Sequence, residues 1–135
     1  MKTITVAALT EQLEPLTAFV EGVLEDEGCP YAVIMQMNVA LDEIFTNISL
    51  YAYGAEGGEV TVSCGVENGS ATLVFTDSGV PYNPLAKADP DVTLSAEERQ
   101  IGGLGIFMVK KMSDSMDYEY VDGKNVLTVC KKVKK

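Results

Sequence analysis

Two glycine-containing dipeptides constrain the fold of this chain more than any other feature. Asn68-Gly69 and Asp122-Gly123 each stand between runs in which apolar and polar residues alternate. Both positions of such a pair tolerate a positive φ angle, which the tight turn of a β-hairpin requires. The sequence therefore predicts two antiparallel hairpins. Their strands are expected over residues 58–66 and 71–77, and over residues 116–121 and 126–132.

Three further segments carry helical patterns. Apolar residues recur at helical spacing through residues 10–27, 30–53 and 102–114. Pro15 is tolerated only in the first turn of a helix, so the first helix is expected to begin later than residue 10. Gly28 is a good terminator for the same helix.

The order of these elements predicts the architecture. A short strand over residues 3–7 comes first, and the full order is β-α-α-β-β, a long connection, then α-β-β. Strands that come as hairpins, with helices long enough to cover one face, indicate the α+β class. We expect a two-layer sandwich whose mixed, mostly antiparallel sheet is covered on one face by about three helices. A length of 135 residues fits one domain over residues 1–135.

Composition excludes several classes of function. A net charge of −10 argues against binding to nucleic acid or to an anionic membrane surface. The chain has no His, which removes the commonest general base and any phosphohistidine chemistry within it. Its 3 Cys lack the spacing of a disulfide framework or a zinc site. Without a signal-peptide pattern or a membrane-span-length apolar run, the expected location is the cytoplasm.

The first candidate site residues are Glu43 and Asn47. Four residues apart, they lie one turn apart on a single helix face, at the edge of the inward apolar set. An Asn oxygen is a suitable Mg²⁺ ligand, and a Glu carboxylate can accept a proton from an attacking hydroxyl. The alternative is a solvent-facing polar pair without function.

The second candidate is the sequence Asp77-Ser78-Gly79 at the end of a predicted strand. A carboxylate here can accept a hydrogen bond from an exocyclic amine such as adenine N6, and Gly79 would let a flat ring approach the backbone. An ordinary turn after a strand explains the same residues equally well.

The third candidate is Gly102-Gly103-Leu104-Gly105, which opens the last helix. Glycines at a helix start let its unpaired N–H groups approach phosphate oxygens, although a structural turn is the simpler reading. Residues 80–101, which precede it, contain three Pro and no apolar period, so they form either a functional flap or an insertion. Arg99 in this segment could reach a phosphate or simply remain solvated.

Taken together, these motifs resemble the GHKL ATPase superfamily. Residues 40–47, 75–84 and 102–109 are similar to its N, G1 and G2 boxes, and the Glu-x-x-x-Asn form is most similar to the anti-sigma factor serine/threonine kinases (RsbW-like). The resemblance covers nearly the whole chain. Many members place a charged residue and then His shortly after the Asn, where this chain has Leu50 and Tyr51.

The resemblance implies a role for each motif. Asn47 would bind Mg²⁺, Glu43 would be the catalytic carboxylate and Asp77 would read the adenine of ATP. Gly79, with the glycine-rich segment 102–105, would shape the pocket. Residues 83–101 would form the ATP lid.

The resemblance also implies partners. Such a kinase phosphorylates a Ser or Thr of a small antagonist protein, binds a sigma factor and is usually a homodimer. The sequence leaves two alternatives to the kinase open. The first is a module that binds ATP or ADP and sequesters a protein partner without phosphoryl transfer. The second is an α+β domain that binds no nucleotide.

Overall fold

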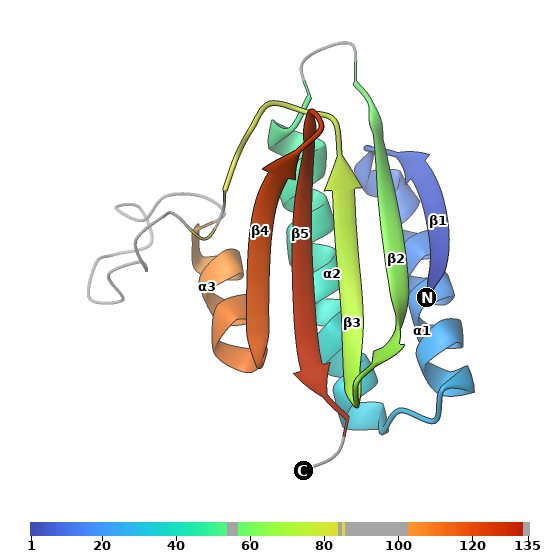
Figure 1. The fold of residues 1–135 in the computed structure, drawn as a ribbon. Coiled ribbons are helices and arrows are strands. Elements are labelled where there is room, and N and C mark those ends of the chain that lie inside the picture. The colour runs from blue at the N-terminus through green and yellow to red at the C-terminus, as the bar shows by residue number, and fades with distance from the viewer. Residues whose placement is uncertain (54–56, 84, 86–102, 134–135) are drawn as a thin grey trace.

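The computed structural model describes residues 1–53, 57–83, 85 and 103–133 (Figure 1). The expected order of elements is confirmed. The bounds are β1 (Lys2–Ala7), α1 (Leu13–Asp26), α2 (Tyr31–Tyr51), β2 (Glu59–Glu67), β3 (Ser70–Asp77), α3 (Gly103–Met112), β4 (Ser115–Val121) and β5 (Lys124–Lys132).

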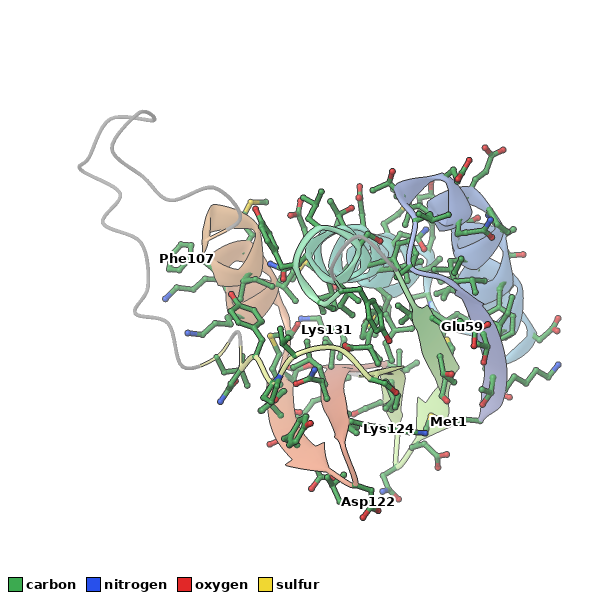
Figure 2. All side chains as sticks on the ribbon, turned by 90° about the horizontal axis from the view of Figure 1, so that it is seen from above. Met1, Glu59, Phe107, Asp122, Lys124 and Lys131 are labelled. Atoms are coloured by element: carbon green, nitrogen blue, oxygen red, sulfur yellow. The ribbon has the colours of Figure 1, made fainter. Side chains whose placement is uncertain are left out.

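The strands form one sheet in the order β1-β2-β3-β5-β4, and every neighbouring pair is antiparallel. The pairing of β3 with β5 joins the two hairpins into a continuous sheet. All three helices lie on the same side of it, with α2 between α1 and α3 (Figures 1 and 2). The predicted two-layer α+β sandwich is therefore confirmed.

Both hairpin turns have the conformation that their sequences predict. Asn68 and Gly69 have φ angles of 52° and 78°, and Asp122 and Gly123 have 52° and 76°. All four lie in the left-handed region, where Gly and Asn or Asp are tolerated. Figure 2 shows Asp122 at the tip of the β4–β5 hairpin. These turns fix the strand register, because Glu67 faces Ser70 across the first hairpin.

The first helix begins where its proline allows. A short 3₁₀ turn over Thr10–Gln12 leads into α1, so Pro15 is the third residue of the helix. This position lacks a backbone hydrogen-bond partner in any helix, so the missing N–H of Pro15 costs nothing. Gly28 follows the helix with a φ of 77° and ends it.

The core lies between the helices and the sheet. Phe45 from α2 and Phe75 from β3 are its largest fully buried side chains, and Val60 and Val62 from β2 are also fully buried. The helix α2 runs through the middle of the helical layer, between α1 and α3. Its face toward the sheet is apolar, and its two sides lie next to the neighbouring helices. The polar residues near its end are thereby placed beside α3 and the sheet.

In the described part of the chain, no helix has the length and apolar character needed to cross a membrane.

Candidate functional site

One cavity lies where the second half of α2, the first turns of α3 and the strands β3, β4 and β5 meet. Asn47 from α2, Asp77 from the end of β3 and Ile106 from α3 all line it. Apolar side chains from α2 and the sheet form most of the remaining wall: Ile44, Ile48, Phe75 and Leu127. The structure thus brings Asn47 and Asp77, from two of the sequence motifs, to one hollow with Ile106, which directly follows the glycine-rich motif. An apolar cavity with a few convergent polar groups is the usual form of a small-molecule site.

Asp77 is a buried carboxylate whose two oxygens differ in their hydrogen-bond partners. It is 6% exposed. Oδ1 accepts hydrogen bonds from the backbone N–H of Gly79 at 2.9 Å and from Asn125 Nδ2 at 3.0 Å. Among the described residues, no group donates to Oδ2. An acceptor without an internal partner on a cavity-lining residue is available to a ligand that carries an N–H donor.

Asn125 holds Asp77 through its side chain, and the two residues pair directly across β5 and β3. Its Nδ2 also donates to the carbonyl of Val80 at 2.9 Å. Its Oδ1 accepts from the backbone N–H of Tyr82 at 3.1 Å and from the hydroxyl of Tyr118. Asn125 is 6% exposed and lines the cavity with Tyr82 and Tyr118. The role of this residue was not predicted from the sequence.

Glu43 meets the first turn of α3. A Cβ placed on Gly105 would lie 2.0 Å from Glu43 Oε2, so the carboxylate fills the space where a side chain would begin. The glycine therefore permits close approach of this carboxylate to the start of the helix. Phe107, two residues further along α3, points away from α2 (Figure 2). Of the predicted pair, Glu43 thus lies against α3, and Asn47, one turn further along α2, lines the cavity.

Asn47 is suited to hold a metal ion only in combination with other ligands. Its side chain lines the cavity and makes no hydrogen bond within the described part of the chain. The same part contains no cluster of three or more His, Cys, Asp or Glu residues that could hold a metal. Mg²⁺ in nucleotide sites is typically held by one or two protein oxygens plus phosphates, so this donor set fits it.

Gly79 has a structural reason to be glycine. A Cβ at this position would lie 2.2 Å from the carbonyl oxygen of Ala52, just beyond α2. The next residue, Val80, donates its N–H to the same carbonyl at 3.0 Å. The turn after β3 is therefore packed directly against the end of α2. The access for a flat ring that we expected from Gly79 remains a prediction.

Tyr53 fixes the same turn from another direction. Its hydroxyl donates to the carbonyl of Glu59 at 2.6 Å and accepts the backbone N–H of Ser78 at 2.8 Å. Gly58 makes room for the ring, since a Cβ there would lie 2.3 Å from a ring carbon. This tyrosine links the end of α2 to β2 and to the turn beside Asp77, and its role was also missed from the sequence.

Several predicted features lie outside the described residues. Arg99 and Gly102 are among them, as is most of the proposed lid over residues 83–101. Gly103 is the first residue of α3, and Leu104 follows it within the helix. The helix start is thus where the glycine-rich motif predicts it.

The fold and the cavity define a domain of the GHKL type, an α+β sandwich with a cavity between its central helix and its sheet. The chain belongs to the family of histidine kinase-like ATPase domains, whose family model matches residues 6–131.

Individual relatives agree with this assignment. The protein named Serine-protein kinase RsbW from Bacillus cereus is 27% identical over 126 residues, covering 90% of this chain and 79% of that protein. The protein of the same name from Bacillus mycoides is 26% identical over the same length. A crystal structure of the RsbU and RsbW domains of a Mycobacterium tuberculosis protein matches with a TM-score of 0.67 and 13% identity. That match covers 100% of this chain and 33% of the other, and it bears on the fold alone.

Proposed function

We propose that this protein is an ATP-dependent serine/threonine-protein kinase of the anti-sigma factor type. It would transfer the γ-phosphoryl group of ATP to a Ser or Thr of a small antagonist protein and would also bind a sigma factor. The observation that carries this proposal is the cavity shared by Asn47, Asp77 and Ile106 of α3, together with the position of Glu43 against Gly105 of the same helix. Similarity to the RsbW serine-protein kinases supports it.

The chemistry of the cavity supports ATP binding. The apolar walls suit a purine ring, and the unpartnered Oδ2 of Asp77 would accept a hydrogen bond from the adenine amino group. The N–H groups at the start of α3 would contact phosphate oxygens. Asn47 would hold Mg²⁺, which neutralises part of the phosphate charge when it is bound. This matters in a chain whose net charge is −10.

Phosphoryl transfer requires mostly positioning and a group that takes the proton of the attacking hydroxyl. Glu43 is the described carboxylate that lies against α3, where the phosphates would be held. In the proposed reaction, the acceptor hydroxyl loses its proton to Glu43 as its oxygen bonds to the γ-phosphorus. The bond between that phosphorus and the bridging oxygen breaks, and ADP leaves. Arg99 would add positive charge from the lid.

The partners are inferred from the resemblance of the sequence motifs to the anti-sigma factor kinases and not from a surface of this chain. An antagonist protein with an acceptor Ser, a sigma factor, a homodimeric state and a cytoplasmic location all belong to this part of the proposal. The name of the relatives, Serine-protein kinase RsbW, supports the reaction class.

The test is incubation of the protein with γ-labelled ATP, Mg²⁺ and a candidate antagonist protein from the same genome. Label on a Ser or Thr of that protein supports the kinase. Binding of ATP without transfer to any such protein would favour a regulatory module that sequesters its partner. If Mg-ATP does not raise the melting temperature at all, nucleotide binding itself is wrong, because a ligand of the folded state must stabilise it.

A further inference from the structure

We propose that Asn125 and Tyr118 are positioning residues that set the base selectivity of this site. They would fix the Asp77 carboxylate so that it accepts a 6-amino purine and rejects a 6-oxo purine. This inference rests on the proposed function, because it deepens the role of the same cavity.

The orientation of the Asn125 amide is determined by its neighbours. Its Oδ1 faces the backbone N–H of Tyr82, which can only donate. Its Nδ2 faces the carbonyl of Val80, which can only accept. A flipped amide would place acceptor against acceptor and donor against donor. The N–H of Asn125 must therefore point at Asp77, across a distance of 3.0 Å.

This orientation dictates what Asp77 can offer a ligand. Oδ1 already accepts two N–H groups, from Gly79 and from Asn125. Both donors pull the carboxylate into one rotamer, and Oδ2 is left as the free acceptor. Because Asp77 and Asn125 are each 6% exposed, water competes little for these bonds.

Base discrimination follows from this fixed acceptor. An exocyclic amino group would donate to Oδ2, whereas an exocyclic carbonyl in the same place would set acceptor against acceptor. A buried polar group that a ligand leaves unpaired produces strong rejection of that ligand. Adenine and hypoxanthine nucleotides differ at this position of the ring, so ATP and ITP form a matched pair of probes.

Tyr118 supports the network from the neighbouring strand β4. Its hydroxyl donates to Asn125 Oδ1, and its side chain lines the cavity. Removal of this hydroxyl leaves the fold and the ring in place while loosening Asn125. Tyr120 lies two residues along the same strand and is 46% exposed, so it provides a matched control.

The experiment measures the dissociation constants of Mg-ATP and Mg-ITP by calorimetry for four proteins: wild type, Tyr118→Phe, Asn125→Asp and Tyr120→Phe. We expect the wild type to prefer ATP by at least about a hundredfold. Tyr118→Phe should lower that preference about tenfold, the size of one lost hydrogen bond to a buried group. Asn125→Asp should nearly abolish it, because it replaces the N–H that faces Asp77 with an oxygen. Tyr120→Phe should match the wild type.

The outcomes separate this inference from the proposed function. Absence of nucleotide binding by the wild type would refute the proposed function and this inference with it. If the wild type prefers ATP and folded Tyr118→Phe keeps the same preference, the positioning role is wrong while ATP binding stands. Tyr118→Phe decides alone if Asn125→Asp does not fold, as judged by circular dichroism.

Discussion

The carboxylate of Glu43 occupies the space in which a side chain on Gly105 would begin. The separation of 2.0 Å between Glu43 Oε2 and a Cβ placed on Gly105 is far below any normal contact. The atom that blocks the glycine is the end of a flexible side chain and not the backbone. The close approach is therefore expected to constrain the position of Glu43 more than the stability of the fold.

Gly105→Ala tests this relationship. The new methyl group would push the Glu43 carboxylate away from the start of α3. We expect phosphoryl transfer to fall on the order of a hundredfold, since a displacement of about 1 Å in a catalytic group has effects of that size. Stability in urea should change by less than about 1 kcal/mol, because alanine also favours the helix.

Gly22→Ala is the matched control, since a Cβ at Gly22 on α1 would meet nothing within 4 Å. It should retain full transfer activity and gain a small amount of stability. If the Gly105→Ala variant transfers phosphate at the wild-type rate, the close contact between Glu43 and Gly105 is not needed for activity.

Glu43→Gln separates binding from chemistry. The amide has nearly the same shape as the carboxylate but does not accept a proton. We expect ATP affinity to stay within about threefold, while transfer to the acceptor protein falls by at least about a hundredfold. Calorimetry and labelled-ATP assays on the same preparation measure both quantities. Transfer at the wild-type rate would remove Glu43 as the base.

Asn47→Ala should weaken the binding of Mg-ATP. The amide lines the cavity and has no hydrogen-bond partner among the described residues, so its loss should matter only when a ligand is bound. We expect the affinity to fall at least about tenfold with Mg²⁺ present, the size seen when support for a bound metal is lost. Affinity measured with excess chelator should change much less. Equal losses under both conditions would indicate a role unrelated to the metal.

Gly79→Ala should lower the stability of the fold, whereas Gly105→Ala should leave it nearly unchanged. Here the blocking atom is the backbone carbonyl oxygen of Ala52, only 2.2 Å from the added Cβ. Neither the end of α2 nor the turn after β3 moves cheaply, so we expect a loss of stability of about 2 kcal/mol. Chemical denaturation measures it directly. A variant as stable as the wild type would show that this turn is free to shift.

Local chemistry in the sequence was enough to predict the fold. The dipeptides Asn68-Gly69 and Asp122-Gly123 determine their own turns through their φ preferences, and Pro15 restricts where its helix begins. Such signals act within a few residues, so they do not depend on the rest of the molecule. The same holds for the placement of Glu43 and Asn47 on one face of a helix.

The supporting residues of the site could not be predicted in this way. Asn125 matters because the strand register sets it opposite Asp77, and that register joins segments 48 residues apart. Nothing in its immediate sequence distinguishes it from a solvent-facing Asn after a turn. In the sequence, Tyr53 is distinguished only as a residue at the end of a predicted helix. Its role depends on contacts with Gly58 and with the turn at Ser78, which only the folded chain forms.

The buried thiol of Cys64 predicts a pH dependence of stability. Cys64 on β2 is fully buried, and its burial raises the pKa from 9.0 to about 12, with smaller contributions from Cys29 and Glu27. The unfolded chain releases this proton near its ordinary value, whereas the folded chain keeps it. Between these two values the folded state binds more protons, so its stability decreases as pH rises. Below about pH 8.5 the contribution of this residue should be fully present and constant.

Urea denaturation of the wild type and Cys64→Ala from pH 7 to pH 10.5 measures this effect. Other groups titrate in the same range, so the difference between the two proteins isolates Cys64. We expect that difference to be constant up to about pH 8.5. Above pH 9 the wild type should lose stability faster, by up to roughly 1.4 kcal/mol per pH unit. Parallel curves over the whole range would mean that the thiol ionises as readily in the folded protein as in the unfolded chain, and that the site opens to water.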